Sequence, residues 1–379
     1  MLKKNRFMQE NKALIERLFY NRGIDVEIQG FNNPRQGKWC FYPRLSIIAP
    51  RKPSAAVNDY ALSHYDTRGG IHRIVGRKIA RRAYLNSFGL LAAGSMDITG
   101  ISQEEKHWMF LIRKRALYLL DFSDATVTSV QKNSQPRQSF KNLLEFRKNH
   151  DYSFLPNLIE YGEDWYRETF IKGKLLSLYE NSSDYNTLLS QSLDCIKALA
   201  KDTLVFKDPR EYSDELCRRI ANNLEELSVD PDCRNVYKQI AGQYSEKAQQ
   251  LNKMVPVVRA HCDFHPANIM VDKQGEVYIL DWEANDQRSI WYDPAVMLLG
   301  LRRPDGLREI LSKFDGEKVS EALLFNDGEK NYNMESLVSF LALENLLGKT
   351  IIAADFKERA GAFLDRTIQF HRERFDENR

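Results

Sequence analysis

The sequence contains few of the residues that build disulfide frameworks or histidine-rich metal centres. Its 379 residues include only five cysteines and seven histidines, and no two cysteines form a C-x-x-C pair. An odd number of scattered cysteines is typical of thiols in a reducing compartment rather than of a disulfide or zinc framework. No apolar run approaches the roughly 18 residues of a membrane span, and the first residues, MLKKNRFMQENK, continue into polar sequence without the pattern of a signal peptide. We therefore expect a cytoplasmic protein.

The chain also has little net charge, but that charge is unevenly distributed. The whole sequence carries +3, whereas residues 1–85 hold 17 lysines and arginines against 6 aspartates and glutamates, a net charge of +11, so the remainder carries −8. Such a basic segment favours an anionic partner, although a solvated face or a basic arm packed on the rest of the protein would give the same count.

Residues 71–85 combine this positive charge with an apolar stripe. Apolar side chains stand at positions 71, 74, 75 and 79, between Arg73, Arg77, Lys78, Arg81 and Arg82. The pattern predicts a basic amphipathic helix that could contact a membrane surface. The alternative is a helix packed on the protein with its basic side in water. We expect no nucleic-acid partner.

One short stretch concentrates polar side chains of the kind found in enzyme sites. Residues 261–283 read HCDFHPANIMVDKQGEVYILDWE, which places Asp263 and Asn268 on a loop and Asp281 at the end of an apolar strand. Two kinds of site use such residues. A metal-dependent hydrolase would use the H-x-D-x-H group as ligands, and a phosphotransferase would use one aspartate at the acceptor hydroxyl and an Asn/Asp pair for magnesium.

The residue types favour the phosphotransferase. Phosphoryl transfer from ATP mainly needs positioning and charge neutralisation, so it requires a carboxylate near the acceptor, oxygen ligands for magnesium and a cation on the donor phosphates. Mg²⁺ is a hard cation that prefers the oxygens of Asp and Asn. A zinc hydrolase more typically uses several histidines, and this chain has seven in all. A polar loop with no catalytic role is the third interpretation, which the spacing between apolar strands disfavours.

The rest of the sequence predicts a small sheet followed by a larger helical part. Residues 117–175 have the pattern of a hairpin, a helix and a second hairpin. Residues 176–254 and 335–375 have mostly helical patterns. Residues 1–100 show only short extended pieces and allow no clear assignment.

The motif and its neighbours resemble the aminoglycoside phosphotransferase and choline kinase-like superfamily. H-C-D-F-H-P-A-N-I-M-V followed by I-L-D-W-E is similar to the catalytic loop and metal strand of that family. Asp293, in W-Y-D-P-A-V-M-L-L, matches an aspartate that braces the catalytic loop, and W-Y-R-E-T-F-I-K-G-K-L-L resembles the hinge strand. The resemblance is specific over 255–300, fair over 117–175 and absent over 1–100.

This resemblance implies an α+β, two-lobed protein-kinase-like fold, with a small antiparallel-sheet N-lobe, a larger mostly helical C-lobe and an extra basic N-terminal segment. We expect residues 1–100 to form the basic N-terminal extension and residues 101–173 the small nucleotide-binding lobe. Residues 174–379 would form the helical lobe, which would carry the catalytic and acceptor-binding residues.

The resemblance also implies roles for individual residues of the motif. Asp263 would be the catalytic base or the carboxylate that orients the acceptor hydroxyl. Asn268 and Asp281 would bind magnesium. His261 and Asp293 would support the loop.

The nucleotide contacts would come from the small lobe. Lys132 would reach the α- and β-phosphates of ATP, and Glu145 would pair with Lys132 and hold it. Backbone groups at the hinge would contact adenine; these belong to Thr169, Phe170 and Ile171. The sequence departs from the family because it has no clear Gly-rich loop ahead of Lys132, and the basic run 113–115 stands where such a loop would lie.

The sequence therefore predicts a kinase that uses ATP and Mg²⁺ to phosphorylate a hydroxyl of a small-molecule or glycan-like acceptor. Residues 176–254 carry a net charge of only −3, which disfavours a polycationic aminoglycoside because a pocket for one would be more acidic. The alternative is a catalytically weak pseudokinase that acts as a nucleotide-binding or scaffolding protein. The lack of a Gly-rich loop favours this alternative, and the intact Asp263, Asn268 and Asp281 oppose it.

Overall fold

The computed structural model of the chain describes residues 2–31, 33, 36–42, 45–63, 92–101, 103–113, 115–132, 138–302, 333–354 and 359–377. The chain forms two compact units, one made of Met1–Tyr185 with Met270–Glu283 and the other of Asn186–Ile269 with Ala284–Arg379. Each unit buries hydrophobic clusters of its own. The basic helix predicted over 71–85 lies outside the described residues.

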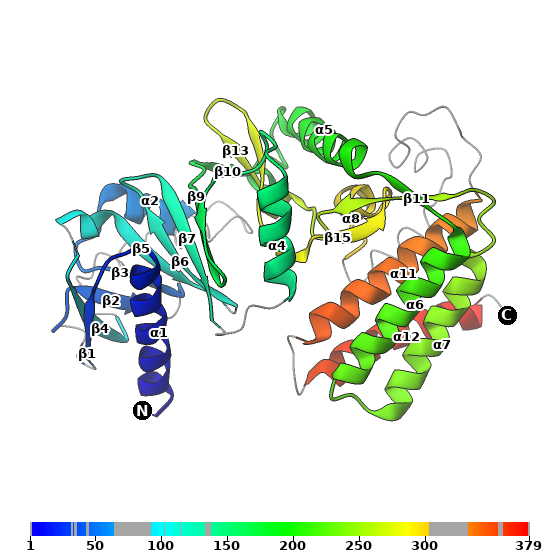
Figure 1. Cartoon of the computed structure of the whole chain (residues 1–379), viewed down its shortest axis with the longest axis horizontal. Coiled ribbons are helices and arrows are strands. Elements are labelled where there is room, and N and C mark those ends of the chain that lie inside the picture. Colours follow the sequence, from blue (N-terminus) through cyan, green and yellow to red (C-terminus); the bar gives the residue numbers. More distant parts are fainter. Residues whose placement is uncertain are drawn as a thin grey trace. The chain divides into compact units, whose positions relative to one another are not determined.

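An antiparallel sheet organises the described part of the first unit (Figure 1). Its nine strands have the spatial order β1-β4-β2-β3-β5-β6-β7-β9-β8, and each neighbouring pair is antiparallel. The strands are β1 (Glu27–Phe31), β2 (Trp39–Tyr42), β3 (Ile47–Pro50), β4 (Gly94–Thr99), β5 (Trp108–Ile112), β6 (Ala116–Asp121), β7 (Thr126–Gln131), β8 (Leu158–Tyr161) and β9 (Trp165–Thr169). Strands from the first hundred residues therefore continue directly into those that follow.

Helices cover both faces of this sheet, which explains why its central strands are apolar. Every residue of β5 is buried, as expected of a strand that has no face toward solvent. On one face α1 (Leu2–Asn21) contributes Leu18 to a cluster with Trp108 and Leu117. On the other face the short helix α2 (Ala55–Ser63) contributes its own apolar residues to a separate cluster.

A second, three-stranded sheet and the helix α4 complete the first unit. Its strands are β10 (Gly173–Leu175), β13 (Ile269–Asp272) and β14 (Val277–Ile279), in that spatial order. In α4 (Gln138–Asn149), the ring of Phe146 stacks on Trp282 with the ring centroids 4.6 Å apart. The segment that follows β14 is thereby packed onto α4.

The second unit is mostly helical in its described part. Its elements are α5 (Tyr185–Thr203), α6 (Pro209–Glu226), α7 (Pro231–Ala248), α8 (Tyr292–Leu299), α11 (Met334–Ala353), α12 (Ala360–Glu377) and the strands β11 (Val205–Lys207), β12 (Val255–Ala260) and β15 (Asp286–Ser289). Helices α6 and α7 each begin with an aspartate N-cap followed by proline. The aspartate accepts hydrogen bonds from the first amides and the proline presets helical φ, so these starts are encoded locally.

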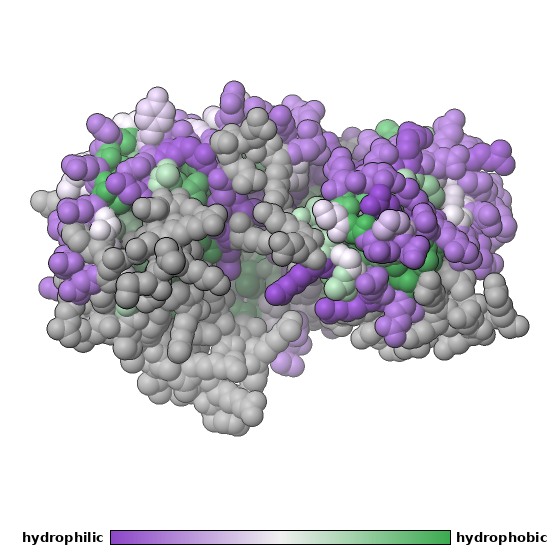
Figure 2. All heavy atoms as spheres, turned by 90° about the horizontal axis from the view of Figure 1, so that it is seen from below, coloured by the Kyte–Doolittle hydropathy of each residue, from purple (hydrophilic) through white to green (hydrophobic). Residues whose placement is uncertain are grey.

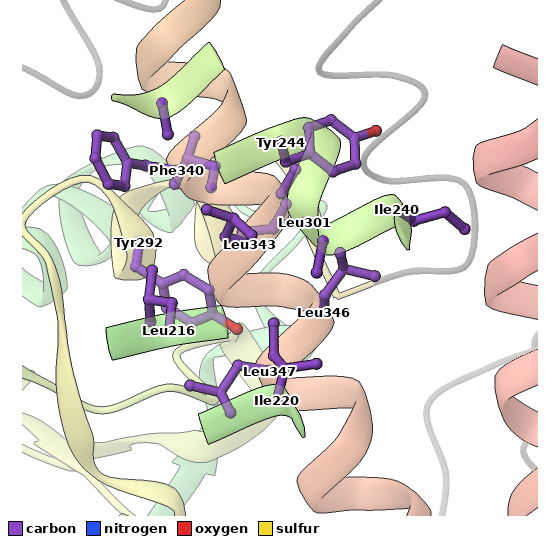
Figure 3. Packing of buried hydrophobic residues seen from close by; sticks show 14 of the residues in the cluster. Leu216, Ile220, Ile240, Tyr244, Tyr292, Leu301, Phe340, Leu343, Leu346 and Leu347 are labelled. Atoms are coloured by element: carbon purple, nitrogen blue, oxygen red, sulfur yellow. The ribbon is translucent and has the colours of Figure 1, made fainter. Parts of the chain in front are cut away.

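Helix α11 is central to the core of the second unit. Figure 3 shows Leu343, Leu346 and Leu347 of this helix among apolar side chains of α6, α7 and α8. In the described part of the chain, α11 is also the one helix that is long and apolar enough to span a membrane, but 78% of that stretch is buried within the structure. Packing inside the unit thus accounts for its apolar sequence.

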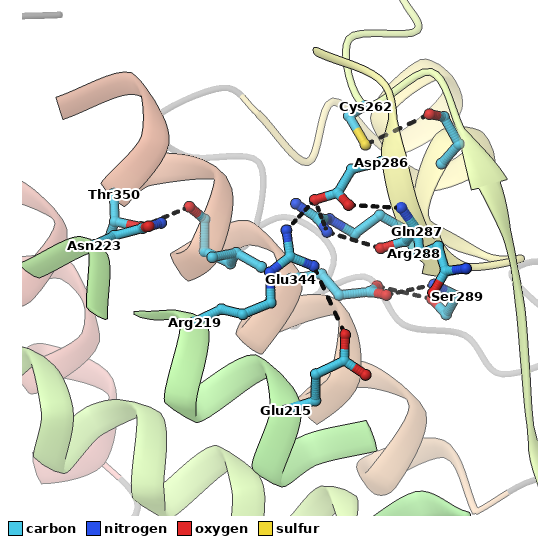
Figure 4. Close-up of polar contacts among 12 residues, drawn as sticks. Glu215, Arg219, Asn223, Cys262, Asp286, Gln287, Arg288, Ser289, Glu344 and Thr350 are labelled. Atoms are coloured by element: carbon cyan, nitrogen blue, oxygen red, sulfur yellow. Dashed lines mark hydrogen bonds and ion pairs between the residues drawn. The ribbon is translucent and has the colours of Figure 1, made fainter. Parts of the chain in front are cut away.

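A buried glutamate joins α11 to the sheet of the second unit (Figure 4). Glu344 is fully buried. Its carboxylate accepts hydrogen bonds from Tyr212 Oη (2.6 Å) and Ser289 Oγ (2.8 Å), and also from the Ser289 amide. Burial raises the pKa of Glu344, while the bonds from Ser289 and Tyr212 and the charge of Arg288 oppose that rise. These donors replace the water that the carboxylate loses on folding.

The outer surface contrasts with these buried clusters. On the face shown in Figure 2, the described surface is mostly hydrophilic, with smaller hydrophobic areas. Leu204, Val205 and Phe206 are a local exception, because they are consecutive, apolar and exposed. They lie at β11, which is an edge strand of its sheet.

The predicted fold class, an α+β protein with an antiparallel-sheet part and a mostly helical part, is confirmed by the structure. The prediction that the sheet part is the smaller one is wrong, because the first unit also contains the N-terminal residues and is the larger of the two. The two units do not end at the predicted boundaries, residues 100 and 173. β3 pairs with β5 through Ile47 and Leu111, so the N-terminal extension shares one sheet with the small lobe. The segment Met270–Glu283, expected in the helical lobe, belongs to the first unit.

We predict that Glu344→Ala lowers the free energy of unfolding by about 3 kcal/mol or more, because it leaves buried donors of Tyr212 and Ser289 without an acceptor. Glu344→Gln should cost less. Its remaining carbonyl oxygen can still accept from two donors, and the Ser289 hydroxyl can reorient to accept from the new amide. Urea unfolding of the parent and both variants measures the difference.

Glu335 provides the matched control for this prediction, because it lies on the same helix but is exposed, where its carboxylate meets Lys247 at 2.8 Å. Exposed ion pairs contribute little to stability. Glu335→Ala should therefore leave the unfolding midpoint nearly unchanged. Equal losses for Glu335→Ala and Glu344→Ala would contradict the role given to Glu344.

Candidate active site

The loop between β12 and β13 is anchored by a buried aspartate. Asp293, in the first turn of α8, is 2% exposed. Its carboxylate oxygens accept hydrogen bonds from the backbone amides of His261 (2.6 Å) and Cys262 (2.9 Å). Burial raises the pKa of Asp293 to about 7, although both amide bonds act to lower it. The structure thus brings together His261 and Asp293, the two residues predicted to support the loop.

The backbone of this loop is left-handed at Cys262, with φ 64°. Residues other than glycine rarely adopt this conformation, and they keep it only where the surroundings fix it. The hydrogen bond from the Cys262 amide to Asp293 is one such constraint. The other comes from His261, whose ring Nδ1 accepts a hydrogen bond from the Asp263 amide (3.1 Å). A neutral His261 ring therefore carries its proton on Nε2.

The carboxylate of Asp263 has two side-chain partners. Arg302 Nη1 contacts Asp263 Oδ1, and His265 Nε2 lies 3.3 Å from the same oxygen. Because His265 Nδ1 accepts a hydrogen bond from the amide of Ala267 (3.2 Å), its Nε2 carries the proton that faces Asp263. Burial alone would raise the pKa of Asp263, but the bond from His265 and the charge of Arg302 outweigh burial and lower it to about 2. Asp263 is therefore ionised at neutral pH.

Asn268 ends the helical turn Pro266–Asn268 that follows. Its side-chain Nδ2 donates a hydrogen bond to the backbone oxygen of Asp263 (3.0 Å). Its backbone N–H donates a hydrogen bond to the backbone oxygen of His265 (2.9 Å). Since the side-chain nitrogen is engaged, the side-chain oxygen is the atom left for a hard cation. The donor chemistry of Asn268 therefore fits the magnesium role predicted for it.

Asp281 lies in the first unit, two residues after the end of β14, and it also has a left-handed backbone, with φ 62°. Burial, followed by the charges of Glu283 and Asp281, raises the pKa of Tyr118. Burial also raises the pKa of Glu168, where Arg147 opposes the rise and Asp281 adds to it. Asp281 is therefore one member of an acidic group in the first unit. Among the described residues, no group of three or more His, Cys, Asp or Glu side chains is placed to hold a metal ion.

Two arginines balance this acidic group. Arg147 of α4 pairs with Glu168, with Nη1 2.8 Å from Oε2, and Arg115 Nη1 lies 3.8 Å from Glu283 Oε2. Arg115 belongs to the tight turn between β5 and β6, which the hydrogen bond from the amide of Arg113 to the oxygen of Ala116 closes (3.0 Å). This turn contains Arg113 and Arg115, the described residues of the basic run found at the expected place of the phosphate loop.

Lys132 and Glu145 were predicted to form an ion pair, but the buried ion pair of α4 is that of Arg147 with Glu168. Lys132 directly follows β7, and its amide donates a hydrogen bond to the oxygen of Arg115 (2.9 Å). Glu145 is exposed, whereas Arg147 lies on the buried face of α4. The nucleotide role of Lys132 and the support by Glu145 stay predictions.

The predicted adenine contacts lie where β9 ends. The Thr169 amide donates a hydrogen bond to the oxygen of Asn157 (2.9 Å), and the Phe170 amide donates to that of Ala125 (2.7 Å). Both amides therefore already serve the first unit's own hydrogen bonding. Among the described residues, no backbone partner is seen for the Ile171 amide, so Ile171 is the best placed of the three to donate to adenine.

Sequence reasoning missed two arginines of the site. Arg147 has a signal in the sequence, because it follows Leu143 by four residues and Leu144 by three, the spacing of the apolar face of a helix. Arg302 has no such signal. It lies 40 residues beyond Cys262, whose backbone oxygen accepts a hydrogen bond from it at 3.3 Å, and only the path of the chain after α8 brings it there.

The sheet and α4 of the first unit, the helices of the second and the loop held by Asp293 define an α+β protein. Its family resemblance is confirmed by sequence comparison, since residues 160–327 match the model of the phosphotransferase enzyme family, APH. The matched range includes Asp263, Asn268, Asp281 and Asp293, and begins after Lys132 and Glu145. No curated protein matches the chain.

Several solved structures are similar to the chain. Choline kinase from Cryptosporidium parvum Iowa II is 12% identical, with 73% of this chain and 92% of that chain covered and a TM-score of 0.42. An ethanolamine kinase from Plasmodium vivax is 11% identical, with coverage of 83% and 93% and a TM-score of 0.47. Aminoglycoside phosphotransferase APH(3'')-Id from Streptomyces rimosus is 14% identical, with coverage of 63% and 92% and a TM-score of 0.39.

We predict that Asp293→Ala speeds hydrogen exchange at the amides of His261 and Cys262 about tenfold or more. Each amide loses its acceptor in a buried place, which costs about 1–3 kcal/mol, and local opening becomes correspondingly easier. Amide hydrogen exchange followed by NMR or mass spectrometry measures this without any substrate.

The control for this prediction is Asp272→Ala. Asp272 also accepts hydrogen bonds from two amides, those of Gln274 and Glu276, but in an exposed turn of the first unit. Its loss should change exchange at that turn alone. Unchanged exchange at His261 and Cys262 in Asp293→Ala would show that other contacts hold the loop.

Proposed function

We propose that this protein is a phosphotransferase that moves the γ-phosphate of ATP to a hydroxyl of a small-molecule or glycan-like acceptor. The observation that carries the proposal is the loop 261–268. Its backbone is held by Asp293 and His261 so that it presents an ionised, partly exposed Asp263. The match to the phosphotransferase enzyme family over residues 160–327 supports the same reaction type.

Asp263 acts mainly by orienting the acceptor. A carboxyl group with a pKa of about 2 is a weak base, so it does not remove the proton from a hydroxyl before the reaction starts. It accepts a hydrogen bond from the acceptor hydroxyl and aims the oxygen at the γ-phosphorus. As the new O–P bond forms and the bond to ADP breaks, the hydroxyl proton becomes acidic and passes to Asp263. This sequence suits phosphoryl transfer, in which positioning contributes more than proton removal.

Asn268 and Asp281 would each supply an oxygen to magnesium. The ion, when bound, neutralises charge on the donor phosphates. The side-chain nitrogen of Asn268 donates to the backbone of Asp263, so one residue ties the metal-binding role to the position of the base. Asp281 is presented by the left-handed turn after β14.

The donor phosphates also need a cation, and two candidates lie in the first unit. Lys132 is the family's candidate. Arg115 is the second, because it lies 3.8 Å from Glu283, two residues beyond Asp281. Thr169, Phe170 and Ile171 would contact adenine, with Ile171 as the amide donor.

A cytoplasmic location is part of the proposal, as is peripheral contact with an anionic or membrane surface through residues 71–85. The support for both is the sequence, that is, the free thiols expected in a reducing compartment and the basic amphipathic pattern.

A non-catalytic pseudokinase is the second candidate function, and one observation favours it. Arg302 contacts the Asp263 carboxylate directly, and a carboxylate that stays in this ion pair does not serve an acceptor hydroxyl. Transfer of labelled phosphate from ATP to any hydroxyl compound separates the two candidates, since a pseudokinase binds the nucleotide and transfers none.

We predict that Asp263→Asn lowers kcat for phosphoryl transfer about 10²- to 10⁴-fold, because an amide accepts no proton. The affinity for ATP with magnesium should stay within about twofold, because Asp263 faces the acceptor and not the nucleotide. Labelled-phosphate transfer gives kcat, and calorimetric titration gives the affinity. Asp194→Asn, on the exposed face of α5, is the control and should change neither. Near-normal turnover of Asp263→Asn would remove Asp263 from this role.

We predict that Asp281→Asn weakens the binding of magnesium and ATP together, because the substitution removes the carboxylate charge that would help to hold the ion on the donor phosphates. The affinity for ATP with excess EDTA should change little. Titration of ATP with and without magnesium measures both. Asp272→Asn in the same hairpin is the control. An unchanged magnesium dependence in Asp281→Asn would place the metal elsewhere.

A further inference from the structure

Arg302 contacts Asp263 and has a second cation at its own backbone, and the two cations come from different elements of the second unit. Arg302 follows α8, which ends at Gly300 in a left-handed cap with φ 63°. The amide of Leu301 donates a hydrogen bond to the oxygen of Ala295 (3.2 Å), so the chain leaves the helix on a fixed path. Arg302 Nη1 then contacts Asp263 Oδ1 and donates a hydrogen bond to the oxygen of Cys262 (3.3 Å).

The second cation is Lys349 of α11. Its Nζ donates a hydrogen bond to the backbone oxygen of Arg302 (3.1 Å) and lies 5.9 Å from the ring centroid of Phe363. Burial and the charge of Arg302 lower the pKa of Lys349. Among the described residues, no carboxylate forms an ion pair with Lys349, so its partly buried ammonium lies near the like charge of Arg302 without an anionic partner.

The charges at this place therefore do not balance. Arg302 and Lys349 provide two positive charges, and in the described part of the chain the one carboxylate that contacts either of them is that of Asp263, which contacts Arg302. A partly buried ammonium near a like charge is unfavourable unless an anion offsets its charge. Lys349, which lacks this anion, contacts the backbone of Arg302, and Arg302 contacts the proposed base, Asp263.

We propose that the acceptor is anionic, a hydroxyl compound whose carboxylate or phosphate group is bound by Arg302 and Lys349 while its hydroxyl meets Asp263. This inference rests on the proposed function and names its substrate class. It differs from a choline-like or aminoglycoside acceptor, since a cationic acceptor would meet two positive charges and be repelled.

An anionic group also explains how Asp263 becomes available. A guanidinium has several donors in a planar fork and can serve two anions at once. When the acceptor's anionic group takes donors of Arg302, Asp263 keeps its position through the loop but shares its arginine. Its carboxylate then has room to accept the hydroxyl hydrogen bond. In this arrangement Arg302 holds Asp263 in place before the acceptor arrives and binds the acceptor afterwards.

Four compounds of similar size test the proposal, namely glycerol, serinol, glycerate and glycerol phosphate, which are neutral, cationic, carboxylate-bearing and phosphate-bearing. We expect kcat/KM for phosphorylation of glycerate or glycerol phosphate to exceed that for glycerol about tenfold or more, with serinol the poorest. Comparison of glycerate with glycerol phosphate shows which anion the site takes. Lys349→Gln should lower the preference for the anionic compound over glycerol about tenfold. Lys197→Gln, on the exposed face of α5, should leave it unchanged.

Calorimetry with glycerate and glycerol phosphate, in the presence of ADP and magnesium, separates this inference from the proposed function. If none of the four compounds is phosphorylated but an anionic one binds the parent protein and binds Lys349→Gln about tenfold more weakly, the anion site stands and the kinase proposal fails. A preference for serinol or glycerol overturns the inference, as does an unchanged preference in Lys349→Gln. Absence of both phosphorylation and binding of the anionic compounds overturns it too.

Discussion

The candidate site depends on one constraint, namely the two hydrogen bonds that the Asp293 carboxylate accepts from backbone amides. A buried carboxylate is unfavourable unless hydrogen bonds replace its water, and the amides of His261 and Cys262 do so. In return, these bonds fix a left-handed residue immediately before Asp263. Without this acceptor, Cys262 would return to an ordinary conformation and Asp263 would point elsewhere. The backbone position of Asp263 is therefore set by these hydrogen bonds, while Arg302 and His265 contact its carboxylate.

The position of α11 links this loop to the stability of the second unit. Glu344 fixes the helix to β15 through Ser289, and Lys349 lies five residues further along the same helix. The bond that sets the register of α11 also sets the place where Lys349 meets Arg302. A change that weakens Glu344 should thus disturb the surroundings of Asp263 before the unit unfolds. Stability and site are coupled here through one helix.

The parts of the structure that the sequence predicted are those encoded by neighbouring residues. The loop with Asp263 and Asn268 and the hairpin that leads to Asp281 are local, so their spacing was enough to find them. The strands within residues 1–100 could not be predicted in this way, because they pair across a long stretch of chain. For example, β1 pairs with β4, with Glu27 opposite Thr99. Short strands with distant partners leave no period in the sequence that identifies the sheet they join.

Two arginines were overlooked in the sequence for simple physical reasons. Glu145 was chosen because it lies one helical stretch from Lys132, yet the period of α4 places Arg147 on the buried face and Glu145 in solvent. A search for a lysine–glutamate pair therefore overlooked an arginine paired with Glu168. Arg302 was overlooked because the motif identifies Asp263, Asn268 and Asp281 but says nothing of the charges that the fold brings to Asp263.

Arg302 is the residue at which the two candidate functions diverge. In a pseudokinase the ion pair of Arg302 with Asp263 would be permanent, so the Asp263 carboxylate would stay neutralised. Such a pair needs no further cation beside it, and a neutral residue in place of Lys349 would be more favourable because a partly buried ammonium is costly. The presence of Lys349 at the backbone of Arg302 is unfavourable for a closed ion pair and useful for a site that receives an anion. The charge excess therefore favours an enzyme whose base is held ready by an arginine that the acceptor then shares.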